Sequence, residues 1–140
     1  MAHTETVRAH GHEHVAATHQ STFELTTDDY LTPAGDCILG IEADRAPADF
    51  DDEFVAACQG ADVTITATLE VADASHTITG RGDPELAFTN DRSMVGRTST
   101  YVDDRTIMCE ADAAATDVPR AIVEALADGA DLTMTLTVEP

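Results

Sequence analysis

The clearest pattern of apolar and polar positions lies over residues 63–71, VTITATLEV, where every second residue is apolar. A period of two is typical of a strand that buries one of its faces. Weaker alternation and one short apolar run predict four more strands in the first two thirds of the chain. These strands cover residues 4–10, 21–26, 37–43 and 76–81, and a hairpin at ADAS, 72–75, joins the last of them to 63–71.

Helical spacing of apolar residues follows Asp49, a residue type that is favoured as an N-cap. Gly60 is expected to end this helix in a left-handed conformation. The apolar face of the helix consists of Phe50, Phe54, Val55 and Cys58. A second helix is predicted after Asp117, which is again a suitable N-cap, with Pro119 and Arg120 in its first turn.

The second half of the chain resembles the first. Residues 42–44, EAD, align with 110–112, and after a one-residue insertion GAD at 60–62 aligns with 129–131. The alternating threonines of the strand at 63–71 align with those near the end of the chain, and about half of the aligned positions are identical. We interpret this self-similarity as an internal duplication of a unit with the order strand, strand, strand, helix, strand.

The sequence therefore predicts an α+β fold. Two β-β-β-α-β repeats, at 3–71 and 72–140, are expected to merge into one curved sheet or barrel that carries two helices. A unit of this size buries too little surface to be stable alone, so residues 1–140 are expected to form a single domain.

Charge is the strongest signal in the composition. The chain has a net charge of −20, with 27 acidic residues, seven arginines and no lysine, and the acidic residues are spread along its whole length. This composition is typical of proteins from extreme halophiles, because at about 1 M salt the Debye length is only about 3 Å and self-repulsion is screened. The charge therefore does not exclude a nucleic-acid partner.

Location and redox state follow from what the sequence lacks. No apolar run approaches the roughly 20 residues that span a bilayer, and no signal peptide is visible, so we expect a cytoplasmic protein without a membrane partner. Three cysteines without a CxxC spacing argue against disulfides and a cysteine zinc site. In the repeat alignment Cys58 and Cys109 face apolar residues, whereas Cys37 faces Arg105.

Candidate chemistry is concentrated at residues 11–26, GHEHVAATHQSTFELT. Imidazole and carboxylate groups are ligands of zinc and non-haem iron, so this stretch predicts a divalent metal site. The candidate ligands are His10, His12, His14, His19 and Glu24. Two alternatives are open: the histidines stabilise a turn, or they act as acid–base groups.

Further residues are candidates for a ligand-binding site beside these groups. The repeat alignment pairs His12 with Asp83 and His19 with Asn90, so a site on a pseudo-two-fold axis would draw on both loops. We expect the remaining candidates to contribute a carboxylate, a thiol and, at the start of the second helix, an anion-binding guanidinium. These residues are Asp36, Cys37 and Arg120.

Three motifs resemble an archaeal family, domain of unknown function 371. They are GH-xx-V-x-A-T-H-x-(S/T)-T-x-E from Gly11, L-T-P-x-G-D-C-I from Leu31, and R-T-I-x-x-x-A-D-x-A-A-x-D-(V/I)-P-R from Arg105. The resemblance covers essentially the whole chain and implies an archaeal cytoplasmic protein, but it does not indicate a substrate. It includes His12, His19 and Glu24 but not His10 or His14. The loop at 82–85 departs from the family pattern, which argues against a symmetric site of four histidines.

We expect an uncharacterised conserved archaeal protein that binds a metal, such as zinc, or a small anionic ligand in a pocket formed by His12, His19 and Glu24. The alternative is a non-enzymatic module that binds RNA or a protein partner. Glycine-rich phosphate loops and the GxSxG nucleophile motif do not occur, and aromatic residues make up only 4% of the chain. The sequence leaves open whether the protein is an enzyme and which oligomer it forms.

Overall fold

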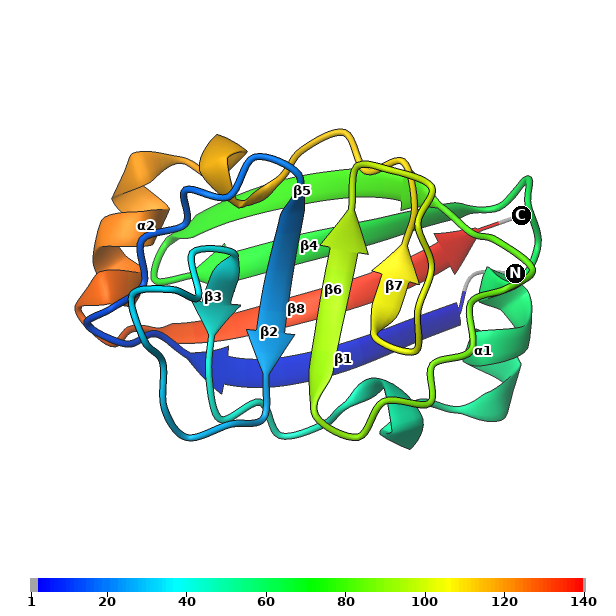
Figure 1. Ribbon diagram of the computed structural model, residues 1–140, viewed down its shortest axis with the longest axis horizontal. Helices are drawn as coiled ribbons and strands as arrows, with labels where there is room; N and C mark the ends of the chain where they lie inside the picture. The colour runs from blue at the N-terminus through cyan, green and yellow to red at the C-terminus, as the bar shows by residue number, and fades with distance from the viewer. Residues whose placement is uncertain (1–2, 140) are drawn as a thin grey trace.

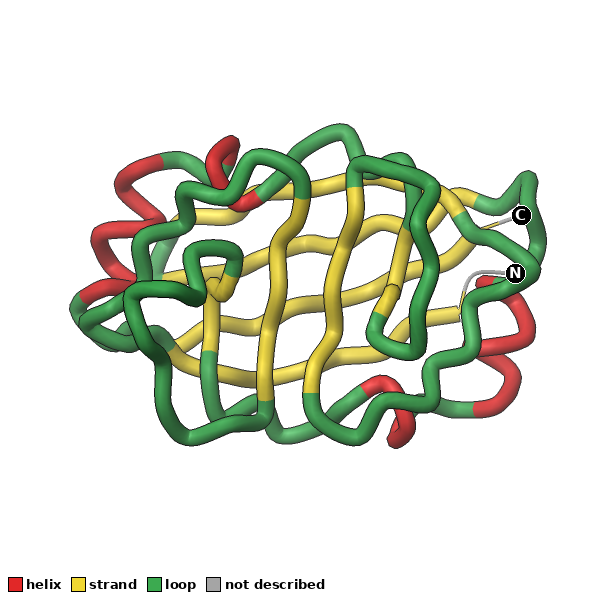
Figure 2. The backbone as a smooth tube through the Cα atoms, viewed as in Figure 1, coloured by secondary structure: helices red, strands yellow, loops and turns green. Residues whose placement is uncertain are grey.

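Eight strands form two four-stranded sheets, one behind the other, whose strands cross at a steep angle (Figure 1). A computed structural model describes residues 3–139. Within this range two α-helices lie at opposite ends of the pair of sheets, and long loops connect the strands of the front sheet (Figure 2). The predicted α+β class, with eight strands and two helices, is confirmed.

The first sheet is antiparallel throughout and has the order β1-β8-β4-β5. Its strands are β1 (His3–His10), β8 (Asp131–Glu139), β4 (Thr64–Val71) and β5 (Ala74–Arg81). Apolar residues such as Val7, Ile65 and Leu136 are fully buried between the sheets, and most of the residues that alternate with them are threonines. The hairpin between β4 and β5 is tighter than predicted, because only Ala72 and Asp73 form its turn.

The second sheet has the order β3-β2-β6-β7. Its strands are β2 (Thr22–Thr26), β6 (Ser93–Arg97), β3 (Ile38–Gly40) and β7 (Thr106–Met108). The central pair, β2 and β6, is antiparallel, and each edge strand is short and parallel to its neighbour.

The alternatives of one curved sheet or a closed barrel were wrong. Among residues 3–139, the β-bridges between the edges of the two sheets are isolated ones, between His10 and Ile41 and between Arg81 and Cys109. Because β3 and β7 have three residues each, their ladders end before they can pair along β1 and β5, and the sheets stay separate.

The helices begin later than predicted. The first α-helix, α1 (Asp52–Cys58), is capped by Asp51, whose carboxylate accepts a hydrogen bond from the N–H of Glu53. Asp49 instead ends a short 3-10 turn, η1 (Pro47–Asp49), and accepts from the N–H of Ala46. The second half has the same arrangement in η2 (Ala115–Asp117), where Asp117 accepts from Ala114, and α2 (Arg120–Ala127) follows. The extra turn explains why the helices were predicted to begin too early. In a sequence, an aspartate that caps a 3-10 turn cannot be distinguished from the N-cap of an α-helix.

A buried ion pair attaches α1 to the first sheet. Glu5 of β1 is 7% exposed, and its carboxylate contacts the guanidinium of Arg45 at 2.6 Å and the backbone N–H of Asp51 at 2.6 Å. The Arg45 guanidinium also lies 5.2 Å from the centre of the Phe50 ring. The end of β1 is held closely by the second helix: a Cβ at Gly11 would lie 1.8 Å from the carbonyl oxygen of Leu126, so only glycine fits there.

Candidate functional site

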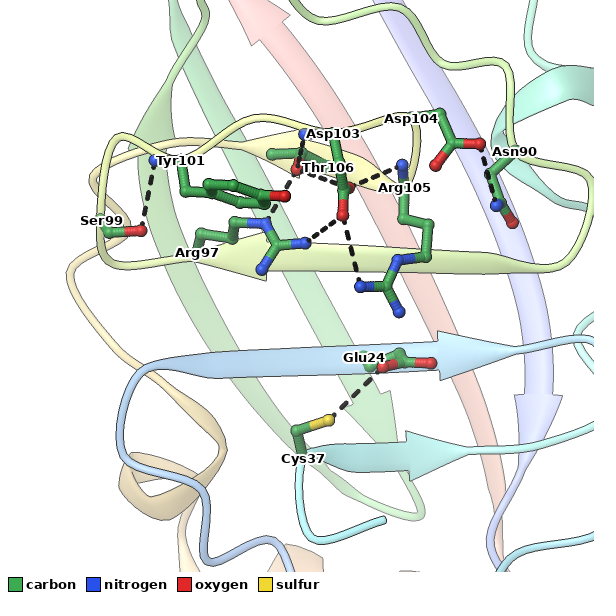
Figure 3. A network of polar contacts seen from close by, with 10 residues as sticks. All are labelled: Glu24, Cys37, Asn90, Arg97, Ser99, Tyr101, Asp103, Asp104, Arg105 and Thr106. Atoms are coloured by element: carbon green, nitrogen blue, oxygen red, sulfur yellow. Dashed lines mark hydrogen bonds and ion pairs between the residues drawn. The ribbon is translucent and has the colours of Figure 1, made fainter.

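The outer face of the second sheet brings together several of the residues that the sequence singled out. In β2, Phe23 and Leu25 are fully buried in the core, so the alternating residues Thr22 and Glu24 point outward. Cys37 immediately precedes β3, and its thiol is directed towards Glu24 (Figure 3). We refer to this surface as the outer face of the second sheet.

A row across this face passes through Glu24 and Val95, which pair with Ile38 of β3 and Thr106 of β7, and Cys37 and Arg105 immediately precede these two edge partners. The N–H of Glu24 donates to the carbonyl of Cys37 at 2.9 Å, and Glu24 is directly opposite Val95 of β6. The N–H of Val95 in turn donates to the carbonyl of Arg105 at 2.8 Å. Because neighbouring strands are about 4.8 Å apart, the side chains of this row lie within reach of one another.

Cys37 is a thiol rather than a thiolate. Burial, the negative charge of Glu24 and the hydrogen bond from Sγ to the Glu24 carboxylate, which is 3.4 Å long, together raise the pKa of Cys37 to about 11. The thiol is therefore a hydrogen-bond donor at neutral pH and a poor nucleophile. Cys58 and Cys109 are buried in the core, as predicted, and burial raises their pKa values too.

The other half of the row carries a network around Asp103 (Figure 3). The Asp103 carboxylate accepts from the guanidinium of Arg97 at 2.9 Å, from that of Arg105 at 3.3 Å, and from the hydroxyl of Thr106 at 3.1 Å. Burial opposes ionisation of Asp103, but the N–H of Arg105 and the two guanidinium groups outweigh it, so the pKa of Asp103 is lowered. Asp103 is an anion that fixes both arginines.

The two arginines differ in what remains open to a ligand. Arg97 is 11% exposed; its Nε donates to Thr106 at 2.9 Å, and its guanidinium lies 4.8 Å from the centre of the Tyr101 ring. Arg105 is 41% exposed. In the part of the chain that the structure describes, the Arg105 guanidinium donates only from Nη2, and the group is directed towards β2 and Glu24 (Figure 3). Nε and Nη1 of Arg105 are therefore available to an acceptor from solution.

His12 and His19 stabilise turns. Nδ1 of His12 accepts from the N–H of His14 at 3.0 Å, and Nδ1 of His19 accepts from the N–H groups of Ser21 at 3.2 Å and Thr22 at 3.1 Å. A neutral imidazole with an accepting Nδ1 carries its hydrogen on Nε2. The nitrogen that a metal would need in each ring is then already engaged by the backbone.

The aligned residues of the second half have the same role. Oδ1 of Asp83 accepts from the N–H of Glu85 at 2.8 Å. Oδ1 of Asn90 accepts from the N–H groups of Arg92 at 2.8 Å and Ser93 at 2.7 Å. An imidazole nitrogen and a carboxylate or amide oxygen are interchangeable as turn acceptors, which accounts for the mixture of residue types in the alignment.

The metal site has no support from this geometry. Among residues 3–139, no group of three or more His, Cys, Asp or Glu side chains is arranged to hold a metal ion. His19 and Glu24 belong to the same strand and its preceding turn, whereas His12 lies at the other end of the loop. The set of His12, His19 and Glu24 stays a prediction.

Two of the other predicted residues act through the backbone. The guanidinium of Arg120 donates to the carbonyl of Ala17 at 2.9 Å and to that of Val118 at 3.2 Å, so it holds the 11–21 loop against α2. The carbonyl of Asp36 accepts from the N–H of His19 at 3.2 Å, and its side-chain charge contributes to the raised pKa of Cys37. The anion-binding role of Arg120 also stays a prediction.

A cavity of about 380 Å³ lies elsewhere, at the corner of the first sheet where β1 and β8 pair. Its charged lining consists of Arg8, His10, Glu42 and Asp131. Nε2 of His10 contacts the Glu42 carboxylate at 2.9 Å and Nδ1 contacts the carbonyl of Gly11 at 2.8 Å; these two hydrogen bonds raise the pKa of His10. His10 is therefore committed to partners within the chain.

Sequence reasoning did not select Arg97, Asp103, Arg105 or Thr106 as site residues. One signal was available, because the repeat alignment pairs Cys37 with Arg105. Cys37 immediately precedes the edge strand β3, and Arg105 immediately precedes the edge strand β7 of the same sheet. The two residues therefore lie on opposite sides of the central β2–β6 pair. In β6 the sequence does not alternate between apolar and polar residues, because Val95 points outward and yet is only 3% exposed beneath its neighbours.

Comparison with known proteins finds a family model and a relative that each match most of the chain. The model of a family described as Domain of unknown function (DUF371) matches residues 7–139. The uncharacterized protein MJ0206 of Methanocaldococcus jannaschii is 41% identical over 126 residues, which are 90% of this chain and 93% of that protein. The helices among residues 3–139 are too short or too polar to cross a membrane.

Proposed function

Since this chain belongs to the DUF371 family, we propose a function from its own geometry: the outer face of the second sheet binds a small anionic ligand through Arg105. The observation that carries the proposal is the available guanidinium. In a chain with a net charge of −20, Arg105 is held in place through one nitrogen and presents the others to solvent. A fixed planar fork of this kind suits a carboxylate or phosphate.

The surroundings of Arg105 support recognition of a second group on the ligand besides its anionic group. Asp103 neutralises part of the positive charge and fixes the guanidinium, which lowers the entropy that binding would cost. Glu24, on the facing strand, accepts the Cys37 hydrogen bond through one oxygen and has further acceptor capacity. We therefore propose a ligand that carries an anionic group for Arg105 and a hydroxyl or amine for Glu24.

Residues that carry the family resemblance support the choice of this face. Glu24, Cys37, Arg105 and Thr106 all belong to the three motifs, and all four lie on the outer face or in its network. His12 and His19 also belong to the motifs, but their hydrogen bonds account for them as turn residues. We assign no catalytic residue.

Two properties of the whole chain belong to the same proposal. We propose that the two halves arose by duplication, because β1-β2-β3-α1-β4 and β5-β6-β7-α2-β8 have the same order of elements. We also propose that the protein works in molar salt, because 27 acidic residues on 140 would otherwise repel strongly.

The experiment is a thermal-shift screen with phosphate, malonate and the neutral analogue malonamide, in molar KCl. A ligand at 100 times its Kd stabilises the folded state by about 2.7 kcal/mol, enough to raise Tm by several degrees. We expect at least one anion to raise Tm of the wild type and of Arg81→Gln, which removes an exposed arginine already paired with Glu110 at 2.8 Å. Arg105→Gln should abolish the shift.

An unchanged shift in Arg105→Gln would contradict the proposal, as would an equal response to malonamide. If no anion stabilises the wild type, the alternative of a module that binds RNA or protein is favoured, and pull-downs become the appropriate next experiment.

A further inference from the structure

The outer face of the first sheet carries two unbroken rows of threonines. In each row one threonine from every strand lies directly opposite the next, in the order β1, β8, β4, β5. The first row consists of Thr4, Thr137, Thr66 and Thr79, and the second of Thr6, Thr135, Thr68 and Thr77. In each strand the alternating positions include fully buried apolar residues, such as Val7, Ala67, Ile78 and Leu136, so these eight side chains all point away from the core.

These two rows contain no charged residue, although the chain has 34 charged side chains among 140 residues. Charged residues occur in the rows on either side of these two. The row beyond the second contains Arg8 and Glu70, two strands apart, and the row beyond the first contains Arg81 and Glu139, also two strands apart. Each flanking row therefore carries one positive and one negative side chain.

Within residues 3–139 no helix covers this face, because α1 and α2 lie at the ends of the sheets and the second sheet lies on the other side (Figure 1). Four strands about 4.8 Å apart, eight or nine residues long at about 3.4 Å per residue, give a face on the order of 500 Å². Two such faces in contact bury about 1,000 Å², the lower limit of a specific interface.

We infer that this face is the contact between two copies of the chain in a two-fold symmetric dimer. Two copies that each carry a charge of −20 can approach most easily through an uncharged surface. The strands of the two copies stay aligned when the two-fold axis in the plane of the interface is either parallel or perpendicular to them. In projection onto the interface, both arrangements place Arg8 and Arg81 of one copy one strand spacing, about 4.8 Å, from a glutamate of the other copy, Glu70 or Glu139.

The two axes predict different pairs. An axis parallel to the strands brings Arg8 next to Glu70 of the second copy, and a perpendicular axis brings Arg8 next to Glu139. In each flanking row the two attractive neighbours outnumber the one contact between glutamates, so the face is self-complementary in charge, as an isologous contact requires.

Sedimentation equilibrium in molar KCl tests the inference. We expect a dimer for the wild type and for Thr100→Glu, which adds a charge at an exposed threonine outside this face. Thr68→Glu, in the middle of the second row, and Thr77→Glu, on the edge strand β5, should each shift the chain to a monomer while circular dichroism shows native folding. The use of two positions guards against a variant that fails to fold.

A charge exchange identifies the arrangement. Arg8→Glu should weaken the dimer under either axis, and the further change Glu70→Arg should restore it if the axis is parallel to the strands. Restoration of Arg8→Glu by Glu139→Arg instead would indicate the perpendicular axis. A monomeric wild type, or a dimer that Thr68→Glu and Thr77→Glu leave intact, would overturn the inference and leave the face to a different partner.

Discussion

Single side chains in the 11–21 loop show that the role of one residue type in a sequence can be interpreted in two ways. A histidine near a carboxylate suggests a metal ligand, but a histidine two or three residues before a strand can also accept backbone hydrogen bonds through Nδ1. His19 does so towards Ser21 and Thr22, and Asn90 at the aligned position accepts the corresponding bonds through Oδ1. The hydrogen-bond partners of the nitrogen, which support the turn interpretation for His19, cannot be seen in the sequence.

This role predicts that an amide can replace the imidazole. His19→Ala should lower the free energy of unfolding by about 1 kcal/mol, because two backbone N–H groups lose their acceptor. His19→Asn should keep most of that stability, as Asn90 does in the second half. Chemical denaturation in molar KCl measures the difference. Equal losses in both variants, together with bound metal in the wild type alone, would favour the metal site instead.

The thiol of Cys37 gives a second prediction at this scale. With a pKa of about 11, Cys37 should react slowly with iodoacetamide at pH 8, and buried Cys58 and Cys109 should not react in the native protein. Glu24→Gln removes the neighbouring negative charge, so it should lower the pKa of Cys37 and speed the reaction. Mass spectrometry over time follows the labelling, with Glu70→Gln as the control. A faster reaction of the wild type than of Glu24→Gln would show that Glu24 does not suppress the thiolate.

At the scale of elements, the second sheet depends on a few polar connections because its edge strands are short. β3 and β7 have three residues each, and few ladder hydrogen bonds hold them. Asp103 compensates on one side by joining Arg97 of β6 to Arg105 and Thr106 at the start of β7. The network that presents Arg105 is therefore also part of what holds the sheet edge.

The lowered pKa of Asp103 predicts a pH dependence. A carboxyl group whose pKa is lower in the folded than in the unfolded state stabilises the protein above its unfolded pKa, near 3.8, and loses this effect as the pH falls through the lower folded pKa. Asp103→Asn should therefore be less stable than the wild type at pH 7, and the difference should vanish in strong acid. Denaturation midpoints between pH 7 and pH 2 measure it. A constant difference across this range would contradict the ionic role of Asp103.

At the scale of the whole molecule, periodic features could be predicted from the sequence and non-local ones could not. The alternation at 63–71 located β4 to within one residue, and the α+β class with eight strands and two helices followed from the order of the patterns. The number of sheets did not follow, because it depends on the length of β3 and β7, and the apolar run at 37–43 exceeds the three residues that pair. Arg105 was missed as a site residue because Glu24, towards which its guanidinium is directed, is far from it in the sequence and lies on the same face only after folding.

The charge predicts how the whole molecule responds to salt. Lowering KCl from about 1 M to about 0.1 M lengthens the Debye length from about 3 Å to about 10 Å, so the acidic residues repel over longer distances. We expect a lower Tm at 0.1 M salt, and a smaller decrease in a variant with several exposed glutamates changed to glutamine. Calorimetry at matched protein concentration measures both. A Tm that does not change with salt would contradict the proposal that the chain is adapted to molar salt.

Anchoring of an anionic ligand by Arg105 is measured most directly by an NMR titration of the arginine Nε–H resonances. The seven arginines of the chain can be assigned by substitution, and the anion that gives the largest thermal shift is the titrant. We predict a saturable shift of the Arg105 Nε–H, with a smaller response at Arg97 through Asp103. Saturation at Arg8 or Arg81 with no change at Arg105, or no saturable shift at any arginine, would contradict the account.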